Sequence, residues 1–385
     1  MKYINKIKIL FNPRLLYKKI LERRGIIYNI YGTNYKKNVL ISYIIHPFIY
    51  KNLHNHTNIQ EALAIAEIFN SLNFNVDICK FTLTSNLDYK KYNCIFGFGN
   101  PLTNSFYQKN NSIKIYYGTG MNIPYQNNST ISRIKDVYKK KGVLLPESGR
   151  IIPYTYSEQV SFVDAMILLG NTTVAETYRK YYDGPIFTQS PSYFEHILLD
   201  DALEKNWEQA QKHFLWFGSV GAIHKGLDLL LDVFPTRPEY HLHICGLNPK
   251  EQNFIETYRI ELQYPNIHNH GFVDIYSLEY KNIIKTCSYT ILPSCSEAQS
   301  TSLINTMCNG LIPIITKQCG IDIQNFIFQI HTLSPNGIIS VLDNLKKLTP
   351  SECAKLAQKC QHYTRQHYSL KLYKQKLMEN ITKIL

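Results

Sequence analysis

The sequence predicts an α/β protein built from two doubly wound, Rossmann-like domains that face each other across a cleft. With 385 residues, the chain is too long for one ordinary core. Its composition, 44% hydrophobic and 18% charged, is that of a folded globular protein. Short apolar runs alternate with amphipathic helical stretches, which is typical of parallel sheets covered by helices. The alternation occurs twice, on either side of a polar, helix-like connector at residues 196–212.

The first series occupies the N-terminal half of the chain. Strands are expected over residues 39–45, 76–79, 93–98, 113–117 and 165–169. A helix is expected over residues 56–69, and another after Gly170 and Asn171, where Thr173 and Glu176 have the spacing of a capping box. Because ligands bind beyond the carboxyl ends of such strands, we expect binding residues in the loops that follow them.

The second series fills the C-terminal half. Strands are expected over residues 214–217, 241–245, 267–270, 289–292 and 312–315, and helices over 226–234, 252–262, 278–286, 302–309 and 370–385. The chain then divides into a basic amphipathic segment (1–35), a first Rossmann-like domain (36–205), a second one (206–365) and a terminal helix that packs back on the first (366–385). With two such domains, the natural ligand site is the cleft between them.

Most of the net charge of +13 lies at the N-terminus. Residues 1–37 hold ten of the 42 Lys and Arg residues and one of the 29 Asp and Glu residues. Asn12 and Pro13 form a helix-start pair, after which apolar and basic side chains occupy opposite faces. Two interpretations stay open: a helix on an anionic membrane surface, or one docked on the protein's own core with a solvated basic face. Nucleic acid is not an expected partner, because the rest of the chain is only slightly basic and carries no nucleic-acid-binding motif.

The nine cysteines are scattered, and no pair has Cys-x-x-Cys spacing. We therefore expect neither a disulfide framework nor a zinc site, and a reducing compartment. No apolar run reaches the roughly 18 residues of a membrane-spanning helix, and the charged N-terminus is unlike a secretory signal. The expected location is the cytoplasm, with the inner face of the cytoplasmic membrane as the surface that a basic helix would bind.

The segment at residues 289–316 carries the strongest chemical signal. A strand ends at Pro293, a polar loop follows, and Gly310 ends the next helix. The polar side chains of this loop and helix start are Ser294, Glu297, Gln299, Ser300, Thr301 and Ser302. Backbone N–H groups and hydroxyls at a helix start favour a diphosphate, and Glu297 can accept hydrogen bonds from sugar hydroxyls. A simple helix cap is the alternative, but it leaves Glu297 without a role.

This segment resembles the donor-binding region of retaining GT-B glycosyltransferases of the family-4-like, group 1 type. The residues that match in identity and spacing are Pro293, Ser294, Glu297, Gly310 and Pro313. The resemblance implies that Glu297 contacts the transferred sugar. Asn305 stands where these enzymes usually have a second Glu that holds the ribose, so the resemblance implies ribose binding through an amide here.

Residues 216–230 resemble the first loop and helix of the same donor-binding domain. There an Arg after the first Gly, here Gly218, and the Lys of a Lys-Gly pair neutralise the donor diphosphate. Lys225 matches the lysine, but Ser219 stands at the arginine position, so His224 is the candidate to assist Lys225. The alternative for Lys225 is a solvated residue at a helix start, which is less favoured because a cation there opposes the helix dipole.

Three further loops complete the expected site. The segment that borders the nucleotide base in this family is matched by Gly271, Phe272 and Val273. The resemblance implies that the first half supplies the acceptor side, with candidates His54, His56 and Asn58 after the first strand and Gly118, Thr119 and Gly120 after the fourth. Helix capping and a tight turn are the respective alternatives. Two His side chains are weak evidence for a metal site, and no Asp-x-Asp motif is present, so no metal is expected.

The resemblance implies a glycosyltransferase that moves a sugar from a nucleotide-sugar donor to a glycan or lipid-linked acceptor, with retention of anomeric configuration, in cell-envelope polysaccharide or glycolipid synthesis. Glu297 and Lys225 are the expected catalytic residues, and the nucleotide-sugar is a substrate that needs no further cofactor. Two alternatives remain. One is a nucleotide-sugar epimerase on the same fold, and the other is a non-catalytic scaffold, since Ser219 and Asn305 depart from the family pattern. The oligomeric state is not predicted.

Overall fold

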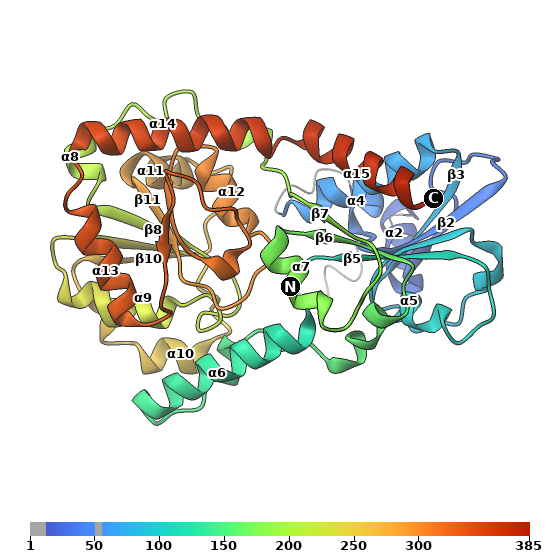
Figure 1. Cartoon of the computed structure of the whole chain (residues 1–385), viewed down its shortest axis with the longest axis horizontal. Helices are drawn as coiled ribbons and strands as arrows, with labels where there is room; N and C mark the ends of the chain where they lie inside the picture. The colour runs from blue at the N-terminus through green and yellow to red at the C-terminus, as the bar shows by residue number, and fades with distance from the viewer. Residues whose placement is uncertain (1–12, 51–55) are drawn as a thin grey trace.

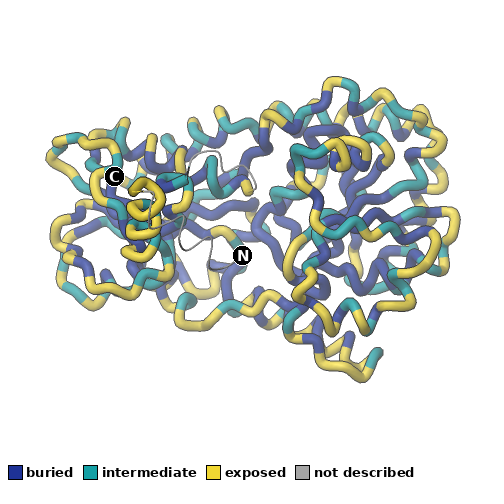
Figure 2. The backbone as a smooth tube through the Cα atoms, turned by 180° about the vertical axis from the view of Figure 1, so that it is seen from behind, coloured by how far each residue is buried: buried dark blue, intermediate teal, exposed yellow. Residues whose placement is uncertain are grey.

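The computed structural model describes residues 13–50 and 56–385, and it consists of two α/β halves side by side along the long axis of the molecule (Figure 1). Each half has a sheet at its centre with helices packed around it. The strands are largely buried, whereas exposed residues gather on the surrounding helices and loops (Figure 2). The predicted fold class, two doubly wound halves, is confirmed.

The first half contains a sheet with the strand order β1-β3-β2-β4-β5-β6-β7 among the described residues. Its strands are β1 (Ile26–Ile27), β2 (Lys37–Tyr43), β3 (Phe74–Lys80), β4 (Cys94–Gly97), β5 (Ile113–Gly118), β6 (Ala165–Leu169) and β7 (Ile186–Gln189). Neighbouring strands are parallel, except that β1 pairs antiparallel with β3 at the edge. Five consecutive residues of β2 are buried, as expected for a central strand covered on both faces.

The helices of this half are α2 (Pro13–Arg24), α3 (His46–Ile49), α4 (Asn58–Ser71), α5 (Asn100–Ser105), α6 (Ile123–Lys141) and α7 (Thr172–Arg179). The predicted capping box at Thr173 is wrong. Asn171 caps α7 instead, because its side chain already accepts the Thr173 N–H at 3.1 Å, and Thr173 lies within the first turn.

The second half contains a parallel sheet with the order β10-β9-β8-β11-β12-β13 among the described residues. Its strands are β8 (His213–Phe217), β9 (His241–Cys245), β10 (Ile267–Gly271), β11 (Tyr289–Leu292), β12 (Ile312–Thr316) and β13 (Phe328–Ile330). Its helices are α8 (Trp207–Ala210), α9 (Leu227–Val233), α10 (Gln252–Thr257), α11 (Leu278–Thr286), α12 (Thr301–Met307), α13 (Pro335–Leu345) and α14 (Pro350–His367). The helix predicted over residues 252–262 is shorter than expected, because a separate 3-10 turn, Glu261–Gln263, follows α10.

The boundary predicted at residue 205 does not separate two packing units. α6 starts beside the first sheet and runs under the second half (Figure 1). Its Ile134 and Val137 belong to the hydrophobic core of the second half, and so do Tyr193 and Ile197. These apolar side chains precede residue 205 but pack in the core of the second half, so the packing joins the halves there.

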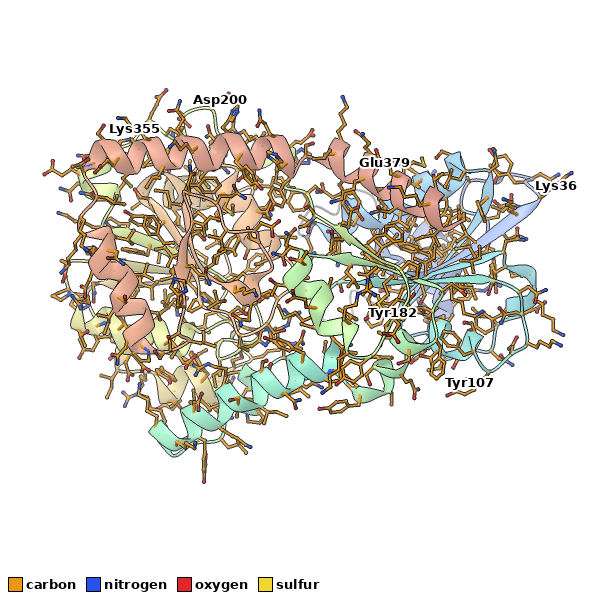
Figure 3. The ribbon with its side chains drawn as sticks, viewed as in Figure 1. Lys36, Tyr107, Tyr182, Asp200, Lys355 and Glu379 are labelled. Carbon is orange, nitrogen blue, oxygen red and sulfur yellow. The ribbon has the colours of Figure 1, made fainter. Side chains whose placement is uncertain are left out.

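The chain returns to the first half at its end. α14 runs along the second half, and α15 (Leu370–Ile384) continues onto the first (Figure 1). Tyr373, Leu377 and Ile381 of α15 are buried in the core of the first half. The labelled Lys355 and Glu379 project outward from α14 and α15, and both are exposed (Figure 3). α6 and this terminal crossing therefore both link the two halves.

α2 lies on the outside of the first half. None of its residues is buried, and Tyr17 and Ile20 are 62% and 52% exposed. Glu22 anchors the helix, because it accepts a hydrogen bond from Tyr50 Oη at 3.1 Å and lies 3.3 Å from His46 Nε2. Asn12, the predicted cap, lies outside the described residues. Within the described ranges, no helix is long and apolar enough to cross a membrane.

Candidate active site

A cavity of about 630 Å³ lies between the two halves. From the first half it is lined by Tyr43, Ile44, His56, Thr57, Asn58, Glu61, Phe81, Phe98, Thr119, Arg150, Leu169 and Phe194. From the second half it is lined by residues 217–219, 246–249, 272–275 and 297–302, with Lys225 and Asn305. Many of these residues follow the carboxyl ends of parallel strands, where doubly wound folds bind their ligands.

The buried Glu297 lies at the centre of the charged groups in this cavity. Its carboxylate forms an ion pair with Lys225 Nζ, and Arg150 Nη1 lies 3.6 Å from its Oε2. Ser294 Oγ donates to its Oε1 at 3.2 Å. Burial alone would raise the pKa of Glu297, but the positive charges of Lys225 and Arg150 outweigh burial and lower the pKa to about 2. Glu297 is therefore ionised at neutral pH and faces two cations.

The loop at residues 218–226, which carries Lys225, is held in shape by hydrogen bonds from both halves. The N–H groups at positions 221 and 222 donate to the buried carboxylate of Glu251 at 2.8 and 3.0 Å. Those at positions 223 and 224 donate to the carbonyl of Ser148, in the first half, at 3.0 and 3.2 Å. Gly226 ends the loop with φ +70°, and a Cβ there would lie 2.1 Å from the Pro293 carbonyl oxygen, so only glycine fits.

His224 does not line the cavity, so it cannot assist at the diphosphate as we expected. Its side chain is fully buried, with Nδ1 2.8 Å from Thr130 Oγ1 and Nε2 4.0 Å from Glu297 Oε1. Burial lowers the pKa of His224 to about 4, so the imidazole is neutral and adds no positive charge. It packs between α6 and Glu297 instead.

The other predicted donor residues divide into two groups. The cavity is lined by Gly218, Ser219, Phe272, Val273, Gln299, Ser300, Thr301, Ser302 and Asn305, and it is not lined by Gly271 or Ser294. Ser294 acts through Glu297, to which it donates. Gln299 Nε2 donates to the Gly320 carbonyl at 2.8 Å. Asn305 Oδ1 accepts the Phe194 N–H at 3.1 Å, so part of the amide that was expected to hold the ribose is engaged within the protein.

On the acceptor side, the cavity is lined by His56, Asn58 and Thr119 but not by Gly118 or Gly120. His56 Nδ1 accepts the Asn58 N–H at 3.1 Å, and burial lowers the pKa of His56, which favours a neutral ring. A Cβ at Gly118 would lie 2.4 Å from Leu168 Cδ2, so packing accounts for that glycine. His54 lies outside the described residues.

Sequence reasoning missed Glu61, which lines the cavity from α4. Its Oε2 accepts from Tyr43 Oη at 3.2 Å and from Tyr117 Oη at 3.5 Å, and Tyr117 also hydrogen-bonds Tyr373 of α15 at 2.9 Å. Burial raises the pKa of Glu61 to about 7, although the tyrosine hydrogen bonds oppose the rise. A usable signal exists, because Glu61 interrupts the apolar face of a predicted helix directly before Ala62.

Sequence reasoning also missed Arg150. It follows α6 and the 3-10 turn Pro146–Ser148, in a stretch without regular periodicity, so nothing in the sequence indicates that it reaches Glu297. Within the part of the chain that the structure describes, no group of three or more His, Cys, Asp or Glu residues is arranged to hold a metal ion.

Residues 201–366 match the model of the family described as Glycosyl transferases group 1. No curated protein matches the chain. Among solved structures, sucrose-phosphate synthase from Thermosynechococcus elongatus is similar, with 11% identity, a TM-score of 0.65, and coverage of 90% of this chain and 99% of that one.

Two further solved structures are similar over both halves. HepE from Anabaena, solved with UDP and glucose, has 11% identity and a TM-score of 0.59, with 91% of this chain and 100% of that one covered. WaaG, a glycosyltransferase of lipopolysaccharide biosynthesis, has 14% identity and a TM-score of 0.55, with 89% and 99% covered. At these identities the likenesses establish the fold. The family model covers the half that carries Glu297 and Lys225, so the predicted resemblance is confirmed there: residues 201–366 match the group 1 glycosyltransferases, and the whole chain has the GT-B fold.

Proposed function

We propose that the chain transfers a sugar from a nucleotide-sugar donor to a glycan or lipid-linked acceptor, with retention of anomeric configuration. The observation that carries this proposal is the ionised Glu297, held by Lys225 and Arg150 in a cavity that both halves line. The structurally similar HepE was solved with UDP and glucose, which agrees with a nucleotide-sugar donor.

In the proposed reaction, the bond between the anomeric carbon and the diphosphate oxygen breaks as the acceptor oxygen bonds to the same face of the sugar. The acceptor proton passes to the leaving diphosphate, so no protein nucleophile is needed. Lys225 stabilises the negative charge that develops on the diphosphate, and Glu297 faces the positive charge that develops on the sugar. Because Lys225 supplies positive charge at the diphosphate, we propose that the reaction needs no metal ion.

We further propose that the enzyme works at the cytoplasmic face of a membrane, on an acceptor of cell-envelope polysaccharide or glycolipid synthesis. Leu16, Tyr17 and Ile20 of α2 face outward beside its basic side chains, which suits an anionic lipid surface. All nine cysteines are free and buried, which agrees with a reducing compartment.

The test is an assay of the full chain with a panel of nucleotide-sugars and candidate acceptors, in which products are identified by mass spectrometry and their anomeric configuration by NMR. Wild-type protein should transfer a sugar, and Glu297→Gln should lower kcat about 100- to 1000-fold while the fold is kept. Interconversion of the donor sugar without transfer would identify an epimerase. If the wild-type protein neither binds nor consumes any nucleotide-sugar, it is a non-catalytic scaffold.

A further inference from the structure

Two of the described residues that line the cavity carry a permanent positive charge, and they are engaged differently. Lys225 is 5% exposed and is paired with Glu297. The Arg150 side chain is 43% exposed, and its Nη1 lies 3.6 Å from Glu297 Oε2, outside hydrogen-bond range. Because a guanidinium presents five N–H donors, this contact leaves Arg150 with capacity for a second anion.

The position of Arg150 is determined by both halves of the molecule. Its carbonyl accepts a hydrogen bond from Gln126 Nε2 of α6 at 2.8 Å. Two residues earlier, the Ser148 carbonyl accepts two N–H groups of the loop at residues 218–226. The Arg150 side chain passes so close to Gly221 that a Cβ there would lie 2.7 Å from Arg150 Cγ. Arg150 therefore lies over the same loop that carries Lys225.

We propose that Arg150 binds the diphosphate of the donor together with Lys225, so that each half of the molecule supplies one cation. This inference rests on the proposed function. A diphosphate brings about two negative charges, and Glu297 offsets part of the positive charge of Lys225, so Lys225 alone cannot balance the diphosphate and Arg150 supplies the second cation. Ser219 lines the same cavity without a charge. A guanidinium can also bind two phosphate oxygens through two parallel N–H groups, a fixed geometry that an ammonium group lacks.

The competing explanation is that Arg150 only stabilises the ionised Glu297. The two explanations differ in what loss of the guanidinium changes. If Arg150 binds phosphate, its removal weakens the binding of a nucleoside diphosphate and leaves the binding of the parent nucleoside unchanged. If Arg150 acts only on Glu297, its removal affects both ligands equally or affects stability alone.

The experiment measures the affinity of the full chain for UDP, GDP, ADP and CDP, and for the matching nucleosides, by calorimetry and thermal shift. Arg150→Ala is expected to weaken the binding of the preferred diphosphate about 10- to 100-fold, with nucleoside binding and the unliganded Tm almost unchanged. Arg150→Lys should recover only part of the loss, because it restores the charge but not the fork. Arg259→Ala is the matched control, because Arg259 pairs with Glu256 on an exposed surface and does not line the cavity.

Three outcomes separate this inference from the proposed function. Selective loss of diphosphate affinity in Arg150→Ala supports both. Tight diphosphate binding by wild type and folded Arg150→Ala alike overturns the inference and leaves the proposed function standing. If wild-type protein binds none of the nucleotides, the proposed function fails, and the inference fails with it.

Discussion

Arg133 of α6 and Asp228 of α9 form an ion pair that is buried where the two halves meet. Their side chains are 6% and 3% exposed. Asp136 lies 3.2 Å from the other terminal nitrogen of Arg133, and Lys140 of the same helix pairs with Asp232. α6 therefore contacts the second half through charged as well as apolar side chains. These ion pairs are part of what holds the two halves together.

Replacing Arg133 by Ala should destabilise the protein by about 3–5 kcal/mol, because Asp228 is left as a buried charge without its partner. The measurement is the free energy of unfolding from urea titration at neutral pH. Arg133→Met combined with Asp228→Leu removes both charges and should recover most of the lost stability.

Arg259→Ala is the exposed comparison, because Arg259 and Glu256 form a surface pair with 61% and 76% exposed side chains. Such a pair contributes at most about 1 kcal/mol, so this variant should unfold close to wild type. Equal stability of Arg133→Ala and wild type would show that the buried pair does not hold the halves together.

Five histidines on one face of β8, β9 and β10 form a hydrogen-bonded cluster. Its members are His213, His241, His243, His268 and His270, and their ring nitrogens pair at 2.9, 3.0 and 3.1 Å. In each pair Nδ1 faces Nε2, so neutral rings that carry the proton on Nδ1 satisfy every contact. Glu279 lies 3.4 Å from His270 Nδ1, where it can accept the last proton, and Lys212 adds positive charge nearby.

This cluster should make the second half sensitive to mild acid. Burial and the neighbouring rings lower the pKa of His213 to about 4 and that of His243 to about 2, below the 6.5 of an unfolded chain. Below pH 6.5 the unfolded state therefore binds protons that the folded state refuses, and stability falls as pH falls. We expect the cluster to contribute a loss of about 1–2 kcal/mol between pH 7.5 and 5.5, since partial exposure of His213 screens its share. Urea unfolding of wild type and a cluster variant at both pH values isolates this contribution from that of other titrating groups.

A substitution within the cluster can distinguish its contribution to the pH dependence of stability from that of other titrating groups. His243→Asn should reduce the slope of stability against pH in this range, whereas replacement of the exposed His331 by Asn should leave the slope as in wild type. Identical slopes for all three proteins would mean that the acid sensitivity lies elsewhere.

The apolar face of α2 gives a third prediction. Leu16, Tyr17 and Ile20 are 42%, 62% and 52% exposed, and basic residues flank them. Wild-type protein should sediment with vesicles that contain anionic lipid and not with neutral vesicles, because binding needs both apolar insertion and charge attraction. Changing Lys18 and Lys19 to Glu should weaken binding at least about tenfold, since each basic residue near such a surface contributes about 1 kcal/mol.

Lys355→Glu combined with Lys359→Glu makes the same charge change on α14 and should leave vesicle binding almost unaffected. Because no residue of α2 is buried, the variant in α2 should keep the Tm of wild type. Equal sedimentation of wild type and the α2 variant would exclude α2 as the membrane contact.

The fold was predictable from the sequence because the local periodicity of apolar residues indicates strands and helices. The predicted strand over residues 289–292 and helix over 278–286 agree residue for residue with β11 and α11. Contacts between distant segments have no such local signal. Arg150 reaches Glu297 across 147 positions of the chain, and the buried His224 contacts Thr130 of α6 through its Nδ1. The sequence therefore indicated the loops that carry Lys225 and Glu297, but it did not indicate that Arg150 and Thr130 of the first half reach them.

Glu61 gives the last prediction, because its carboxyl is buried and forms no ion pair with any cation of residues 13–50 and 56–385. Burial raises the pKa of Glu61 to about 7, whereas the carboxyl of an unfolded chain titrates near 4.5. As pH rises above 4.5, the unfolded state loses this proton first, so stability falls up to pH 7 and stays reduced above it. Glu61→Gln removes the buried charge but keeps an oxygen that can accept from Tyr43. The variant should therefore be more stable than wild type by on the order of 2 kcal/mol at pH 8, and equal to it near pH 4.5.

Glu67→Gln on the same helix is the control, because Glu67 is exposed and pairs with Lys374, so its removal should give no stabilisation at pH 8. A Glu61→Gln protein that is no more stable than wild type at pH 8 would mean that the carboxylate finds enough hydrogen bonds from the tyrosines to remain ionised in the folded cavity.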